Sequence, residues 1–124
     1  MSSRIGRMVT IPLLAALAGC SGQIKTDYEI THERVAAYIA QHPGLDAETR
    51  DAMQHFDLRE GMTMEQAIAT RGRPVMVQLY RDGQQQYWYF GCDWPNICSP
   101  SDHGSPAYRS HAMFENGRVL YWQN

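Results

Sequence analysis

The sequence predicts an α+β domain in which N-terminal helices pack on one face of an antiparallel sheet of three to four strands. Three observations support this class. Apolar residues recur at helical spacing up to residue 71, and they alternate with a period of two after Pro74. Asp82-Gly83 and Asn116-Gly117 are typical of the turns of β-hairpins. Helices followed by hairpins favour an α+β arrangement.

Two helices are predicted in the first part of the domain. The first begins at Thr31 and ends before Pro43-Gly44, and its inner face has residues at i, i+3, i+4 and i+7: Val35, Tyr38, Ile39 and His42. The second has Asp46 as its N-cap. Its inner face is lined by Thr49, Ala52, Met53 and Phe56.

The third helix, at 64–71, has signals at both ends. Thr63 and Gln66 form a T-x-x-Q capping box, and Gly61 lets the chain turn sharply before it. Gly72 suits the left-handed position after the helix, and Pro74 prevents continuation. Capping explains Gly61, Thr63, Gln66 and Gly72, so we interpret this motif, together with Pro74, as structural.

The first hairpin is predicted from strands at 75–80 and 85–90. A two-residue turn at Asp82-Gly83 pairs Arg81 with Gln84, and its register then places two sets of side chains on opposite faces. The predicted core face has Val75, Val77, Leu79, Trp88 and Phe90. The other face has Met76, Gln78, Tyr80, Tyr87 and Tyr89.

The second hairpin is predicted from strands at 108–115 and 118–123. The expected pairs are Phe114 with Val119 and Ala112 with Tyr121 on one face, and Met113 with Leu120 and His111 with Trp122 on the other. Both faces are apolar. We favour the Phe114 face as the buried one.

Candidate partner-binding residues lie on the tyrosine-rich face and in the loop that follows. They are Met76, Tyr80, Tyr87, Tyr89 and Trp94. Tyrosine and methionine are favoured at contact surfaces, and a tryptophan can be a central contact. The alternatives are that loop 91–107 or the N-terminal segment covers the tyrosines, and that Trp94 packs over a disulfide.

The N-terminus is typical of a bacterial lipoprotein. Arg4 and Arg7 precede a short apolar run at 8–18, which is the order of a signal peptide and is too short for a membrane span. The stretch 17–20, Leu-Ala-Gly-Cys, matches a lipobox. We therefore expect cleavage before Cys20 and lipidation of that cysteine. Ser21 follows it, and the absence of Asp there favours the outer membrane.

This interpretation divides the chain into a leader at 1–19, a lipidated tether at 20–30 and one domain at 31–124. The net charge changes from −2 to −4 when the leader is removed. Cys92 and Cys98 remain as a pair, and an oxidising periplasm favours a disulfide between them. Two free thiols, or a metal site with His103 and His111, are the alternatives.

The sequence argues against several function classes. It has no run of basic residues for nucleic-acid binding. It has no nucleophile motif, no trusted metal-ligand spacing and no glycine-rich phosphate loop. We therefore expect no enzymatic activity, no catalytic residues, no metal and no cofactor.

From about residue 58 to residue 122 the chain resembles the SmpA/OmlA family, which contains the outer-membrane assembly lipoprotein BamE. The resemblance is carried by four segments: 61–66 (GMTMEQ), 72–76 (GRPVM), 88–90 (WYF) and 114–119 (FENGRV). It implies two helices packed on an antiparallel sheet of about three strands. The helical extension at 27–57 and the Cys92–Cys98 loop depart from BamE.

These observations predict a lipid-anchored protein on the periplasmic face of the outer membrane. The expected function is binding of an envelope protein, in β-barrel assembly or envelope integrity. The resemblance makes the β-barrel assembly machinery the suggested partner. The alternative is an inhibitor lipoprotein that blocks a secreted or envelope enzyme. Fold alone does not choose between these functions.

Overall fold

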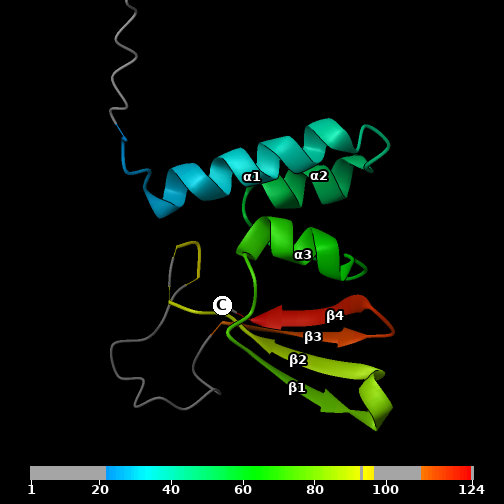
Figure 1. Ribbon diagram of the computed structural model, residues 1–124. Coiled ribbons are helices and arrows are strands. Elements are labelled where there is room, and N and C mark those ends of the chain that lie inside the picture. Colours follow the sequence, from blue (N-terminus) through cyan, green and yellow to red (C-terminus); the bar gives the residue numbers. More distant parts are fainter. Residues whose placement is uncertain (1–21, 93, 97–109, 124) are drawn as a thin grey trace, which may run out of the picture.

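The computed structural model describes residues 22–92, 94–96 and 110–123. Within them the chain forms three α-helices and a four-stranded antiparallel sheet, which confirms the predicted α+β class. All three helices lie on one side of the sheet (Figure 1). Helix α3 lies next to the sheet, and α1 and α2 form a layer beyond it (Figure 1). The predicted residues Cys20 and Cys98 lie outside the described residues.

Helix α1 spans Asp27–Gln41, so the predicted start at Thr31 was wrong. The Thr26 hydroxyl accepts a hydrogen bond from the Glu29 amide at 3.2 Å, and the Glu29 carboxylate accepts one from the Thr26 amide at 2.8 Å. This capping box starts the helix in a polar segment, before the apolar residues that recur at helical spacing. Residues 27–30, which were assigned to the tether, are therefore helical. Val35 is buried on the predicted inner face.

Helices α2 (Ala47–Gln54) and α3 (Met64–Arg71) begin at the predicted caps. Asp46 accepts a hydrogen bond from the Thr49 amide at 2.6 Å. Thr63 and Gln66 bond each other's backbone amides at 3.2 and 2.9 Å. Gly72 has φ of 86°, a conformation that favours glycine, and it ends α3 as predicted.

Strands β1 (Met76–Tyr80) and β2 (Gln85–Tyr89) pair in the predicted register, with Val77 opposite Trp88. The predicted end of the ladder was wrong by one pair. Tyr80 and Gln85 are the last pair, and a short 3₁₀ segment, η1 (Arg81–Gly83), closes the hairpin. The Asp82-Gly83 turn itself is present, because both residues have positive φ and the Gln84 amide donates to the Arg81 carbonyl at 3.1 Å across them. Arg81 also has positive φ, so the regular ladder ends one pair earlier than predicted.

Strands β3 (His111–Glu115) and β4 (Arg118–Gln123) form the second hairpin. Phe114 pairs with Val119 as predicted, but the register shifts before Met113. Leu120 is the unpaired residue of this bulge. A bulge adds one residue to one strand and moves the next side chains to the opposite face. Met113 therefore faces Tyr121.

The remaining predicted pairs of this hairpin were wrong for the same reason. Ala112 faces Trp122 instead of Tyr121, and His111 faces Gln123 instead of Trp122. The choice of the buried face was right, because Phe114 is 0% exposed.

The core lies between the sheet and the helices. Its fully buried large side chains come from both layers and from the connecting segment: Phe90, Phe114, Met53, Met62 and Val119. Gly61 donates to the Val119 carbonyl at 2.8 Å, and the Val119 amide donates to the Met62 carbonyl at 2.8 Å. The chain before α3 therefore covers the β4 edge of the sheet.

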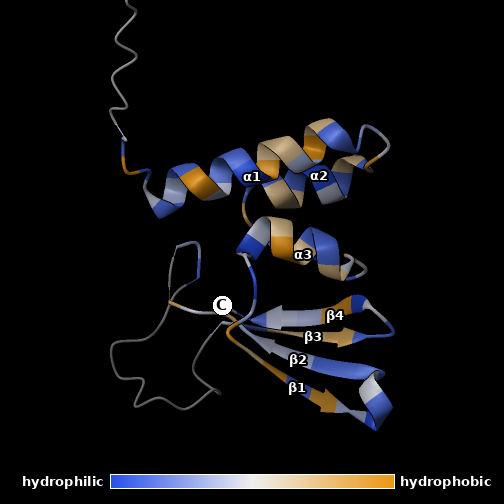
Figure 2. Ribbon diagram, viewed as in Figure 1, coloured by the Kyte–Doolittle hydropathy of each residue, from blue (hydrophilic) through white to orange (hydrophobic). Residues whose placement is uncertain are grey.

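The predicted core face of the first hairpin is buried only in its β2 half. Trp88 and Phe90 are buried, but Val75, Val77 and Leu79 are 62%, 43% and 63% exposed. Strand β1 is an edge strand of the sheet that the described residues form, and it is the strand farthest from the helices (Figure 1). Its apolar residues are visible at that edge in Figure 2. The alternation of side chains therefore predicted the face that each residue occupies, but not whether that face is buried.

Candidate functional site

The sheet face turned away from the helices carries the predicted tyrosine cluster. We call it the outer sheet face. Pairing between β1 and β2 sets Met76 opposite Tyr89 and Gln78 opposite Tyr87, with Tyr80 at the end of β1. The structure therefore brings together the four predicted residues of this face: Met76, Tyr80, Tyr87 and Tyr89.

Contacts between side chains organise this face. The Tyr80 and Tyr87 rings meet edge to face at 5.3 Å between centroids. The Gln78 side-chain carbonyl accepts hydrogen bonds from the Tyr80 and Tyr89 hydroxyls at 3.3 and 3.2 Å. One glutamine therefore fixes two phenol groups while their rings stay at the surface.

The second hairpin extends the face. His111 lies opposite Tyr89 and Met113 opposite Tyr87. The ring of His111 is 5.9 Å from that of Tyr89 and 6.1 Å from that of Tyr121, measured between centroids. Met113 is buried, whereas Tyr121 is 45% exposed. On the outer sheet face, the buried Met113 therefore lies among exposed aromatic side chains that can form hydrogen bonds.

Sequence reasoning missed Tyr121 because it placed this residue on the Phe114 side. Only the bulge at Leu120 turns it outward. No local sequence signal distinguished this register from a regular one, since the strand is apolar on both faces.

The Tyr89 and Tyr121 phenols of this face are neutral at neutral pH. Burial raises the pKa of Tyr89, and the neighbouring Tyr80 and Tyr87 raise it further. Burial also raises the pKa of Tyr121, with a further contribution from the Tyr87 hydroxyl. A surface of neutral phenols can donate and accept hydrogen bonds without the cost of removing a charge from water. This chemistry suits contact with a protein.

The fifth candidate, Trp94, lies elsewhere. Its ring packs 4.8 Å from Tyr28 of α1 and 4.7 Å from Phe56 after α2, between centroids, and it is 39% exposed. His32 stacks on Tyr28 at 5.7 Å. Trp94 therefore belongs to an aromatic cluster at the start of α1 and is not part of the outer sheet face.

Arg71, at the end of α3, explains how the loop holding Trp94 is placed. It is 3% exposed, and its guanidinium donates to the Pro95 carbonyl at 2.8 Å. The Asn96 amide donates in return to the Arg71 carbonyl at 2.9 Å. The guanidinium also lies 4.4 Å over the Trp122 ring. Burial lowers the pKa of Arg71 to about 10, and Asp57 opposes this shift.

No sequence signal indicates this role for Arg71. An arginine in the last turn of a helix is ordinary, because it complements the helix dipole.

The cysteine predictions fall mostly outside the described residues. Cys92 is exposed and is not free, whereas Cys98 and Cys20 lie outside the described part of the chain. The Cys92–Cys98 disulfide and the lipidation of Cys20 therefore stay predictions. Within the described ranges no cluster of His, Cys, Asp or Glu could hold a metal ion. No helix there is long and apolar enough to cross a membrane.

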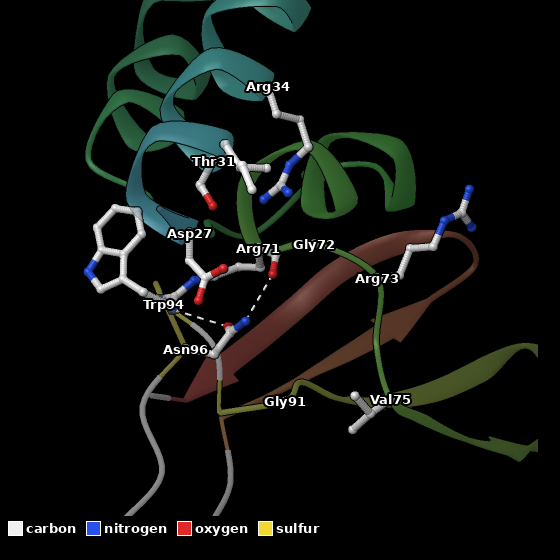
Figure 3. Close-up of a pocket in the computed structure, with 11 residues that line it drawn as sticks. Asp27, Thr31, Arg34, Arg71, Gly72, Arg73, Val75, Gly91, Trp94 and Asn96 are labelled. Carbon is white, nitrogen blue, oxygen red and sulfur yellow. Dashed lines mark hydrogen bonds between the residues drawn. The ribbon is translucent and has the colours of Figure 1, made fainter. Parts of the chain in front are cut away.

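A cavity of about 220 Å³ lies between α1, the end of α3, the start of β1 and the loop at 91–96 (Figure 3). Its polar lining combines cationic, anionic and neutral groups: Asp27, Thr31, Arg34, Arg71, Arg73 and Asn96. Gly72, Gly91, Ile30, Val75 and Trp94 complete the wall. Sequence reasoning did not find this cavity, because its residues come from four separate segments.

No protein-family model, no curated protein and no solved structure matches this chain. The resemblance to the SmpA/OmlA family therefore stays a prediction from four short motifs.

Proposed function

We propose that this protein is an outer-membrane lipoprotein, anchored through Cys20, that binds an envelope protein through its outer sheet face and catalyses no reaction. One observation carries the proposal. Tyr80 and Tyr121 are 48% and 45% exposed on a face that already holds neighbouring tyrosines in fixed positions. Preordered aromatic side chains lose little conformational entropy when a partner binds. The lipobox at 17–20 supports the membrane location.

A pull-down from detergent-solubilised envelopes tests the partner. Tyr80→Lys places a charge on the outer sheet face and is expected to reduce recovery of the partner at least tenfold. Leu79→Lys is the matched control, because Leu79 is the adjacent residue of β1, is 63% exposed and points to the opposite face. Its recovery should equal that of the wild-type chain. An equal loss of partner recovery in both variants, or no loss in either variant, contradicts a role for the outer sheet face.

The identity of the recovered protein distinguishes the two functions suggested by the sequence. Recovery of β-barrel assembly subunits supports the role implied by the SmpA/OmlA resemblance. Recovery of one soluble hydrolase, with loss of its activity in the complex, supports the inhibitor alternative.

Mass spectrometry tests the anchor separately. The N-terminal peptide of the membrane-bound protein is expected to begin at Cys20 and to carry the mass of a diacylglyceryl group and an acyl chain. A peptide that begins at Cys20 without added lipid contradicts the anchor but leaves the binding face to be tested by the pull-down.

A further inference from the structure

The cavity beside α1 is a basic site in an acidic chain. Three arginines and one aspartate line it, whereas the whole chain has a formal net charge of −2. Two of the three arginines need no ligand to account for their positions. Arg71 is held by the 94–96 loop and by Trp122. The side chain of Arg73 extends away from the others (Figure 3).

Arg34 is the arginine whose guanidinium is held in place and whose terminal nitrogens are available to a ligand. Its Nε donates to the Ala69 carbonyl at 2.8 Å, which fixes the plane of the guanidinium. A Cβ built on Gly72 would lie 3.8 and 3.9 Å from the two terminal nitrogens, so both lie beside this glycine at the cavity wall. These nitrogens make no hydrogen bond or ion pair with any residue in the described ranges.

This arrangement has a chemical meaning. Two parallel N–H groups of a fixed guanidinium match the two oxygens of a carboxylate. Burial lowers the pKa of Arg34, which shows that the group is partly removed from water. It stays protonated, and its attraction for an anion is stronger there than at a fully hydrated surface.

Asp27 adds a second recognition element. Asp27, Thr31 and Arg34 are spaced at i, i+4 and i+7, so they share one face of α1 and line the same cavity. No ion pair joins Asp27 to Arg34. A simple anion would be repelled by Asp27. A ligand with a carboxylate at one end and an N–H donor beside it satisfies both groups.

We propose that this cavity binds an α-carboxylate with an adjacent N–H donor, as found at the C-terminus of a peptide or in a free amino acid. Arg34 binds the carboxylate through its two terminal nitrogens, and Asp27 accepts from the N–H. The volume of about 220 Å³ is below the roughly 300–1,000 Å³ of sites for drug-sized ligands, so it suits one residue. The outer sheet face takes no part in this binding, so either site can fail its test alone.

Calorimetric titration of the full chain in detergent tests the ligand. The probes are N-acetyl dipeptides ending in Gly, Ala, Leu or Phe, the same dipeptides with a C-terminal amide, and the four free amino acids. Binding of at least one free carboxylate, with at least tenfold weaker binding of its amide, is expected. Acetyl dipeptides that bind more tightly than amino acids identify a chain end, and the opposite order identifies a free amino acid. Absence of binding by every probe at millimolar concentration overturns the proposal.

Variants locate the binding in this cavity. Arg34→Gln and Arg34→Lys are each expected to weaken binding at least tenfold, because both variants lose the two parallel N–H groups of the guanidinium. Arg34→Lys keeps the positive charge, so it separates the effect of geometry from that of charge. Asp27→Asn should weaken the free amino acids more than the acetyl dipeptides. Arg81→Gln, which makes the same charge change at the far end of β1, is the control and should bind normally. Equal weakening by Arg81→Gln, or normal binding by a folded Arg34→Lys, overturns the assignment.

Discussion

The two hairpins of the sheet have similar sequences and different surroundings. Each has an Asx-Gly turn and alternating apolar side chains on its helix side. In β3–β4 these side chains are buried, with Phe114 at 0% and Val119 at 2% exposure. In β1 the corresponding Val77 and Leu79 are 43% and 63% exposed. The pattern sets which face a side chain occupies, and the helix layer decides whether that face is covered.

The edges of the sheet differ in the same way. The chain at 61–63 bonds to β4 and covers that edge. Strand β1 has neighbours on one side only within the described sheet. An exposed apolar edge strand can associate with another protein chain. The following predictions test how far this difference between the hairpins extends.

The largest effect is expected in the buried hairpin. Phe114→Ala removes a fully buried ring and should lower the free energy of unfolding by about 3–5 kcal/mol. Leu79→Ala, on the same face at the exposed edge, should change it by less than about 0.5 kcal/mol. Urea denaturation of both variants measures the difference. Similar losses would mean that β1 is covered in solution.

The next effect concerns the contact between β4 and α3. Arg71→Leu leaves the Pro95 carbonyl and the Asn96 side chain without their donor and removes the cation over Trp122. We expect a loss of about 2–4 kcal/mol, because buried polar groups lose their partners. Thermal unfolding, together with tryptophan fluorescence of Trp94, measures it. Arg73→Leu is the exposed control, and an equal loss there would refute the anchoring role of Arg71.

A smaller effect should be equal in both hairpins. Gly83 and Gly117 have φ of 84° and 80°, and a Cβ built on either meets nothing within 4 Å. Gly83→Ala and Gly117→Ala should therefore each cost about 1 kcal/mol, from backbone strain alone. Chemical denaturation checks this. A clearly larger cost in one hairpin would show that its turn also contributes to packing.

The smallest effect is a titration shift where the hairpins meet on the outer sheet face. Tyr89 and Tyr121 should lose their protons above the ordinary pKa of 10.0, because burial raises both pKa values. Ultraviolet titration of tyrosinate should show a late component that Tyr89→Phe and Tyr121→Phe each reduce. The protein unfolded in urea is the control and should lack it. An unchanged late component in both variants would assign it to other tyrosines.

Much of the site was predictable, and the exceptions have physical causes. Alternation and the hairpin turn placed Met76, Tyr80, Tyr87 and Tyr89 on one face, because these depend on local backbone geometry. Tyr121 was missed because the bulge at Leu120 reverses its face. Arg34 and Asp27 were missed because a cavity depends on contacts between distant segments.

The sequence by itself determined the helix caps at Asp46 and Thr63, the end of α3 at Gly72 and the register of β1 with β2. Each depends on hydrogen bonds or dihedral angles within a few residues. Only the tertiary structure decided that β1 stays exposed, that Arg71 holds the 94–96 loop, and that α1 and α3 enclose a basic cavity. These features depend on which elements pack together, and burial and desolvation arise only when distant segments meet.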